Sequence, residues 1–349
     1  MAPPRASRPT VAAWLARRDA TCRWIAGGVG MLVRVRTTRT TLATIAAVAA
    51  LTLAGCSGSG GGDRSGTAGG APTATTRPVP VPSPTATADA ATSRAFAALE
   101  ERDDARIGVV AIDTADGSSV GYRADERFAF ASTNKAFIAA AVLDASSGED
   151  LDEVVHYGRG DLLEYAPVTR RYVDEGMTLR ALVDAAVRES DNTAANLLVE
   201  RLGGVGGVSR WLRGIGDDVT RVDRVEPDLN TAVPGDQRDT TTPAQSASDL
   251  RAVLVGDALD AGDRELLRSS MAGTTTGDGT IRAGVPGGWS VADKTGTASY
   301  GVRNDIAVVR PPGRDPVVLV VFTAHERADA EPSDALVAAA TRLAVQRIV

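Results

Sequence analysis

Two stretches of the sequence place hydroxyl and amine groups at spacings that permit nucleophilic catalysis. Ser132 and Lys135 lie three positions apart at the start of the apolar run AFIAAAVL, so an expected helix would present both on one face. Lys294 begins the run Lys-Thr-Gly-Thr, in which hydroxyl and small residues follow the amine. A serine hydroxyl is a weak nucleophile until a base accepts its proton. Each stretch alone also fits a capped helix or a strand end, so the chemistry needs support from the rest of the chain.

Histidine, the usual base beside a serine nucleophile, is absent from both stretches. The chain has two histidines, His156 and His325, and neither lies in a segment that resembles a site. Of the 38 basic residues, 36 are arginine, and the remaining two are Lys135 and Lys294. Arginine stays protonated, whereas the pKa of a lysine ammonium can be moved. Lysine at these two positions therefore indicates chemistry that arginine cannot perform.

The charge and the metal-ligating residues of the chain exclude several classes of function. Residues 1–55 carry a formal charge of +7, so the total of −6 leaves −13 for the rest of the chain. An acidic domain is a poor candidate for nucleic-acid binding. Two histidines and two cysteines, Cys22 and Cys56, leave little for a zinc site. We therefore expect no nucleic-acid partner, no metal and no cofactor.

The N-terminal region has the composition of an export signal followed by a tether. Three arginines precede an uncharged, mostly apolar run that ends in Leu-Ala-Gly-Cys56, an order typical of a secretory signal peptide. This ending resembles a bacterial lipobox, in which Cys56 becomes lipidated. An ordinary signal peptide with a chance cysteine is the alternative, and translation from Met31 instead of Met1 stays open. We predict a signal peptide region over 1–55 and a lipidated, disordered Gly/Ser/Pro-rich linker over 56–88.

Residues 89–349 carry the periodicities of a mixed fold. Apolar strands flank an Asp-Gly turn within 105–130, strands return over 289–324, and helical runs fill the section between them. Strands near both ends predict an α+β fold, with one five-stranded antiparallel sheet built from both termini, flanking helices and an all-helical lobe. We expect a catalytic domain over 89–349 with the sheet lobe at 89–125 and 272–349, the helical lobe at 126–271, and the active site in the crevice between them.

Four short motifs follow one another within this domain. They are Ser132-Thr133-Asn134-Lys135, Ser190-Asp191-Asn192, Glu226-Pro227-Asp228-Leu229-Asn230 and Lys294-Thr295-Gly296-Thr297. The patterns S-x-x-K, S-D-N and K-T-G in this order are typical of class A β-lactamases and penicillin-binding proteins. From about Thr92 to the C-terminus, the sequence resembles a class A serine β-lactamase.

The resemblance implies a role for each motif residue. Ser132 would form an acyl-enzyme with the β-lactam carbonyl, whose oxygen the amides of Ser132 and Thr297 would hold. Ser190, helped by Lys294, would pass a proton to the departing nitrogen. Arg303 would bind the substrate carboxylate, with Arg282 as the alternative. The residues implied to contact substrate are Asn192, Asn230, Thr295, Gly296, Thr297, Arg303 and Tyr165.

The stretch 221–243 has too little hydrophobic content for a helix or strand and has Arg221, Arg224 and Asp239 near its ends. We predict a compact Ω loop closed by ion pairs, with Glu226 pointing inward. The Glu226-Pro227 bond is a candidate for the cis isomer, which the resembled family usually has.

Glu226 is our preferred base for Ser132. Lowering the pKa of a lysine from about 10.4 by roughly three units costs about 4 kcal/mol. We expect Glu226 and Asn192 close to Lys135, which should therefore stay charged. Glu226 would then accept the proton through a water that Asn230 also holds. Lys135 as the base for acylation stays open.

We predict an enzyme that hydrolyses the β-lactam ring of penicillins or cephalosporins and so confers resistance. A D,D-peptidase or penicillin-binding protein is the alternative, although such peptidases lack the motif from Glu226 to Asn230. A non-catalytic lipoprotein that binds cell-wall peptides is a third alternative.

The sequence departs from the family in two ways: no disulfide is possible, and Ala131 and Ala298 stand where the carbapenem-hydrolysing branch has a cysteine pair. We expect a monomer, exported and lipid-anchored at Cys56 outside the cytoplasmic membrane or partly secreted.

Overall fold

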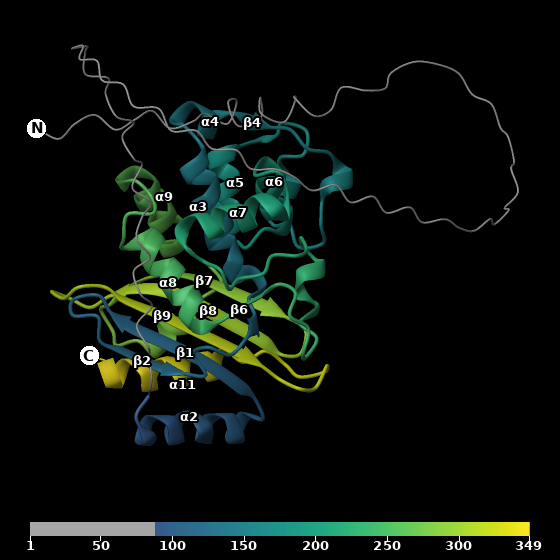
Figure 1. Ribbon diagram of the computed structural model, residues 1–349. Helices are drawn as coiled ribbons and strands as arrows, with labels where there is room; N and C mark the ends of the chain where they lie inside the picture. Colours follow the sequence, from purple (N-terminus) through teal and green to yellow (C-terminus); the bar gives the residue numbers. More distant parts are fainter. Residues whose placement is uncertain (1–87, 349) are drawn as a thin grey trace, which may run out of the picture. The chain divides into compact units, whose positions relative to one another are not determined.

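The computed structural model describes residues 88–348 (Figure 1). The predicted signal peptide, Cys56 and nearly all of the predicted linker therefore lie outside the described residues. Among the helices of residues 88–348, none combines the length and apolar content that a membrane span requires.

A five-stranded antiparallel sheet forms one half of the described region. Its strands lie in the order β2-β1-β9-β8-β7, and each neighbouring pair is antiparallel. The central pairing joins β1 to β9, from opposite ends of the described chain, with Arg106 opposite Ala324 and Asp113 opposite Val317. The predicted α+β class and the sheet built from both ends are thus confirmed. The strands are β1 (Arg106–Asp113), β2 (Ser119–Tyr122), β7 (Ser290–Ala298), β8 (Val302–Arg310) and β9 (Val317–Ala324).

Helices cover both faces of this sheet (Figure 1). Helices α2 (Ala90–Asp103) and α11 (Asp334–Ile348) lie on one face, where Phe96 is fully buried. Helix α8 (Pro243–Leu254) packs on the other face against β1, β8 and β9. A buried phenylalanine contributes about 1.5 to 3 kcal/mol through the hydrophobic effect. Apolar layers thus cover both faces of the sheet, whose strands β7 and β8 carry Lys294 and Arg303.

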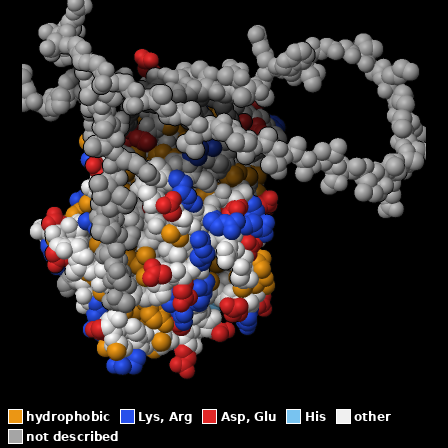
Figure 2. Space-filling model, in the orientation of Figure 1, with side chains coloured by type: hydrophobic (Ala, Val, Ile, Leu, Met, Phe, Trp, Pro, Cys, Tyr) orange, Lys and Arg blue, Asp and Glu red, His pale blue; other side chains and the backbone are white. Residues whose placement is uncertain are grey.

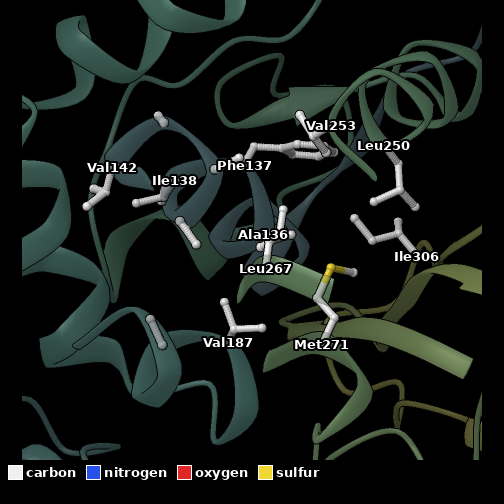
Figure 3. Packing of buried hydrophobic residues seen from close by; sticks show 14 of the residues in the cluster. Ala136, Phe137, Ile138, Val142, Val187, Leu250, Val253, Leu267, Met271 and Ile306 are labelled. Carbon is white, nitrogen blue, oxygen red and sulfur yellow. The ribbon is translucent and has the colours of Figure 1, made fainter. Parts of the chain in front are cut away.

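Helix α3 (Lys135–Ala145) is the centre of the helical half and is buried from Lys135 to Leu143. A helix that is apolar on every side must be surrounded, and α5 (Leu179–Arg188), α6 (Asn192–Arg201), α7 (Val205–Ile215) and α9 (Ala261–Ala272) surround it. Figure 3 shows side chains from α3 in one cluster with side chains from α5, α8, α9 and β8. The labelled members are Ala136, Phe137, Ile138, Val142, Val187, Leu250, Val253, Leu267, Met271 and Ile306. Packing on all sides fixes the position of its first residue, Lys135, and of the preceding turn that carries Ser132.

Short elements connect these layers. They are β3 (Phe128–Ala129) paired with β6 (Thr240–Thr241), β4 (Val154–Val155) paired with β5 (Met177–Thr178), α4 (Gly148–Asp152), α10 (Ile281–Gly284), and the 3₁₀ turns η1 (Ala131–Asn134), η2 (Arg159–Asp161), η3 (Thr169–Arg171) and η4 (Asp228–Thr231).

Basic and acidic side chains alternate over the face of the molecule drawn in Figure 2. Exposed pairs such as Arg106 with Glu126, at 3.0 Å, contribute at most about 1 kcal/mol each. The stability of the fold therefore rests on its two buried clusters and on the buried polar network described next.

Candidate active site

Ser132 lies in η1, directly before α3, and is nearly buried. The preceding residue, Ala131, has a φ of +48°, a left-handed conformation that costs a non-glycine residue about 1 to 3 kcal/mol. Strand β7 passes close to this turn, because a Cβ on Gly296 would lie 3.1 Å from the Ser132 amide nitrogen and 3.0 Å from the Phe130 carbonyl oxygen. Gly296 therefore permits the close approach of the Lys-Thr-Gly strand to the serine.

Lys135, the first residue of α3, is buried, and its ammonium has oxygen atoms of Ser190, Asn192 and Glu226 as partners. Its ammonium donates to the Ser190 carbonyl at 2.7 Å, to Ser190 Oγ at 3.3 Å and to Asn192 Oδ1 at 2.5 Å. It also forms an ion pair with Glu226 Oε1 at 3.0 Å. Burial lowers the pKa of Lys135, and the Glu226 carboxylate opposes that effect. The predicted closeness of Glu226 and Asn192 to this lysine is confirmed.

Glu226 contacts the serine as well as the lysine. Ser132 Oγ donates to Glu226 Oε1 at 3.3 Å, and Asn230 Nδ2 donates to Glu226 Oε2 at 2.5 Å. The backbone of Glu226 is held by Asn196 of α6, which donates to its carbonyl at 2.9 Å and accepts from its amide at 3.0 Å. The Glu226-Pro227 bond is cis, as predicted. The carboxylate therefore points inward, between Ser132 and Lys135.

The loop that carries Glu226 is closed by a buried ion pair. Arg224 Nε lies 2.5 Å from Asp239 Oδ2, and Asp239 is fully buried. Asp239 also accepts the backbone N–H groups of Asp223 and Arg224, both at 2.9 Å. Arg221 instead pairs with Asp223, two residues along the chain, at 2.8 Å. Of the two arginines expected to close the loop, Arg224 alone reaches Asp239.

Ser190 connects the two lysines. It has a φ of +56° at the turn before α6, and its Oγ accepts from Lys294 Nζ at 3.0 Å as well as from Lys135. The next residue, Asp191, caps α6 and also accepts the backbone N–H groups of Val168 and Thr169 at the start of η3. Burial, and then the charge of Lys135, lower the pKa of Lys294 to about 7. The Ser-Asp-Asn motif thus caps a helix, while Ser190 contacts both lysines and Asn192 contacts Lys135.

Arg303 and threonine side chains form a second group beside this network. The Arg303 guanidinium donates to Thr297 Oγ1 at 3.1 Å and to the Thr276 carbonyl at 2.8 Å, and it pairs with Asp334 at 2.5 Å. Thr295 Oγ1 lies 2.6 Å from Thr276 Oγ1. Arg303 is therefore the arginine that lies beside the threonines of β7.

The alternative arginine, Arg282, has other partners. It pairs with buried Asp293 at 2.5 Å and donates to the Ala272 carbonyl at 3.1 Å. Tyr165 is half exposed and is linked to Asn192 through its backbone carbonyl, at 3.0 Å.

The structure thus joins most of the predicted site residues and adds some that the sequence did not reveal. One continuous network contains Ser132, Lys135, Ser190, Asn192, Glu226, Asn230 and Lys294. The residues missed from the sequence are Asn196, Thr276 and Asp334, which lie in no recognisable motif. Within residues 88–348 no group of three His, Cys, Asp or Glu side chains could hold a metal ion.

Residues 91–348 match the model of the β-lactamase enzyme family. A β-lactamase of Amycolatopsis lactamdurans is 54% identical over 257 residues, 74% of this chain and 85% of that protein. A β-lactamase of Bacillus licheniformis is 49% identical over 253 residues, 72% of this chain and 82% of that protein.

Solved structures of β-lactamases are also similar to this chain. The class A β-lactamase of Clostridium kluyveri has a TM-score of 0.73 and 45% identity, covering 74% of this chain and 99% of its own. The β-lactamase of Desulfarculus baarsii has a TM-score of 0.73 and 46% identity, covering 74% of this chain and 97% of its own. The chain belongs to the β-lactamase enzyme family and, within it, to the class A serine enzymes. These relatives carry the name β-lactamase, so the D,D-peptidase alternative is not supported.

Proposed function

We propose that the protein hydrolyses the β-lactam ring of penicillins and cephalosporins through an acyl-enzyme on Ser132, and that it thereby confers resistance to these antibiotics. The observation that carries this proposal is the position of Glu226, whose carboxylate lies 3.3 Å from the serine hydroxyl and 3.0 Å from the Lys135 ammonium. A carboxylate at that place can accept the proton of the nucleophile and can later activate a water.

Acylation begins with proton transfer from Ser132. Glu226 is the acceptor, directly or through a water, because the Lys135 ammonium already donates to Ser190 and Asn192 and pairs with Glu226. The attacked carbonyl then carries negative charge, which the amides of Ser132 and Thr297 would stabilise. The close approach of β7 at Gly296 to the Ser132 amide supports the proposal that the amides of Ser132 and Thr297 act on the same oxygen.

Ring opening requires a proton for the departing nitrogen. Ser190 Oγ is the candidate donor, and Lys135 and Lys294 can resupply its proton, at 3.3 and 3.0 Å. The pKa of Lys294, lowered to about 7, suits a group that gives and regains a proton near neutral pH.

Substrate is held by groups on both sides of the serine. Thr295, Thr297 and Arg303 would bind the carboxylate of the antibiotic, a charge that a guanidinium recognises well. Asn192 would contact the side-chain amide of the substrate, and half-exposed Tyr165 would line the entrance.

Deacylation separates a hydrolase from a protein that stays acylated. Glu226 and Asn230 are already hydrogen-bonded at 2.5 Å, so a water placed between them and the ester would meet a base and an orienting amide. The test is hydrolysis of a chromogenic cephalosporin. We expect turnover by the parent and none above background for Ser132→Ala. Activity retained in Ser132→Ala would refute the nucleophile, and a parent that stays acylated for hours would refute hydrolysis.

We further propose that the protein is exported as a monomer and anchored by lipid on Cys56, with residues 89–349 as the catalytic domain. Support comes from the Leu-Ala-Gly-Cys56 ending and from the composition of residues 57–88. Two acyl chains anchor a protein stably where one does not. Cys56→Ser should move most of the activity from the membrane fraction to the medium, whereas an unchanged membrane-bound fraction would exclude the anchor.

A further inference from the structure

Residues 274–276 are three consecutive threonines between α9 and α10. Thr274 Oγ1 donates to the Asp293 carbonyl of β7 at 2.7 Å. The Thr275 amide donates to the carbonyl of Arg188, the last residue of α5, at 3.1 Å. The segment therefore joins the end of α5, in the helical half, to strand β7 of the sheet.

The backbone around Thr276 is held against the two strands at this edge of the sheet. A Cβ on the next residue, Gly277, would overlap the Asp293 carboxylate, so glycine permits the segment to lie directly against β7. From β8, Arg303 donates to the Thr276 carbonyl at 2.8 Å. These contacts place the side chain of Thr276 beside the Lys-Thr-Gly run.

The Thr276 hydroxyl has one partner, the hydroxyl of Thr295, and the two oxygens lie 2.6 Å apart. Thr295 is buried, and within residues 88–348 neither hydroxyl makes another hydrogen bond. A hydroxyl carries a single proton, so only one of the two can donate to the other. The direction of this hydrogen bond is therefore open until a further partner binds.

A bound carboxylate would decide the direction. Carboxylate oxygens only accept hydrogen bonds, so Thr295 can contact the antibiotic carboxylate only by donating its proton to it. Thr295 Oγ1 must then accept from Thr276. Two hydrogen bonds arranged head to tail in this way strengthen each other. With the opposite direction, Thr295 would have no proton left for the substrate.

We infer that Thr276 is a positioning residue for substrate binding, whose hydroxyl directs the Thr295 proton toward the antibiotic carboxylate. It acts through Thr295 rather than through contact with the substrate. The inference rests on the proposed function, because it assumes that Thr295 and Arg303 bind this carboxylate. The Thr276 side chain has no hydrogen bond to the catalytic network in the described part of the chain, so its removal should weaken binding and spare the chemical steps.

The experiment measures the Kd of benzylpenicillin by calorimetry in protein that carries Ser132→Ala, which separates binding from chemistry. Adding Thr276→Val, which keeps the shape but removes the hydroxyl, should raise that Kd roughly three- to tenfold. Thr276→Ser keeps the hydroxyl and should leave the Kd within about twofold. Thr275→Val is the matched control and should also leave it within about twofold, because the Thr275 hydroxyl contacts Glu189 and not β7.

Thr295→Val tests whether Thr276 acts through Thr295. In that background, Thr276→Val should change the Kd by less than about twofold, because the hydrogen bond is already absent. In the active enzyme, Thr276→Val should raise KM by the same factor and leave kcat within about twofold, as expected when uniform binding is lost. Turnover by the parent tests the proposed hydrolysis separately: a parent without turnover would refute hydrolysis, whereas these Kd changes would still support the inference.

Thermal unfolding of each variant checks that it folds, and Thr276→Ala replaces Thr276→Val if the latter does not. An unchanged Kd on removal of the Thr276 hydroxyl, or an equal increase in Thr276→Ser, would overturn the inference. The same increase with and without the Thr295 hydroxyl would also overturn it, because Thr276 would then act by another route.

Discussion

The Lys135 ammonium and the Glu226 carboxylate form an ion pair at 3.0 Å, and both side chains are 2% exposed. Burial lowers the pKa of Lys135 and the Glu226 carboxylate opposes that effect, so the charge of the lysine depends on its partner. The pair also places Glu226 Oε1 within 3.3 Å of Ser132 Oγ. This one buried ion pair therefore places the proposed base beside the nucleophile and balances the two buried charges.

Removing one partner of this pair should destabilise the fold. Lys135→Met leaves an uncompensated buried carboxylate, and we expect the free energy of unfolding to fall by about 3 to 5 kcal/mol. The double variant Lys135→Met/Glu226→Gln should regain much of that loss, because no charge is then left buried. Urea unfolding of the parent, Lys135→Met, Glu226→Gln and the double variant measures the coupling. Additive losses would show that the two groups do not stabilise each other.

Asp334 competes with substrate for Arg303. Its carboxylate lies 2.5 Å from the Arg303 guanidinium at the site proposed for the antibiotic carboxylate. Asp334→Asn should lower KM for benzylpenicillin roughly threefold, whereas Arg303→Ala should raise it about tenfold or more. Asp329→Asn, which alters an exposed pair with Arg327, is the matched control and should change nothing. Equal KM values for the parent and Arg303→Ala would remove Arg303 from the binding site.

The lowered pKa of Lys294 makes stability depend on pH with a definite sign. Its pKa falls from 10.5 to about 7 on folding, so between these values the unfolded chain binds more protons than the folded chain. Stability therefore increases as pH rises from 7 toward 10. From pH 7 to 9, the increase should be larger in the parent than in Lys294→Met by about 2 kcal/mol. The same increase in both proteins would assign the effect to other groups.

The ion pair between Arg224 and Asp239 should hold the loop that carries Glu226 in place. Asp239→Asn removes the carboxylate that holds Arg224 and two backbone N–H groups, and we expect a loss of about 2 kcal/mol in stability and faster hydrogen exchange over 221–239. Arg238→Gln, whose pair with Asp236 lies closer to solvent, should cost less than about 1 kcal/mol. Similar losses in both variants would contradict a special role for Asp239.

The predictable parts of this protein are those with local signals. Helical and strand periodicity predicts the sheet from both ends of the catalytic region, and short motifs locate Ser132, Ser190, Glu226 and Lys294. The reaction needs particular side chains at particular spacings along the chain, so these residues can be recognised as short motifs in the sequence. The close contact of Lys135 with Glu226 followed from the same motifs.

Contacts between distant segments could not be predicted in this way. Asp334 reaches Arg303 across 31 positions, and Asn196 holds Glu226 across 30, and no motif marks Asp334 or Asn196. The expected pairing of Arg221 with the far end of the loop was replaced by a local contact with Asp223, because a nearer carboxylate was available.

The most direct measurement is the covalent state of Ser132 in Glu226→Gln after brief mixing with benzylpenicillin. The amide keeps the shape of Glu226 but removes the base, which typically costs about 10² to 10⁴ in rate. Mass spectrometry should show the intact drug mass on the Ser132 peptide for minutes in the variant and no adduct in the parent. A variant that clears the adduct as quickly as the parent, or a parent that stays acylated for hours, would contradict deacylation by a Glu226-activated water.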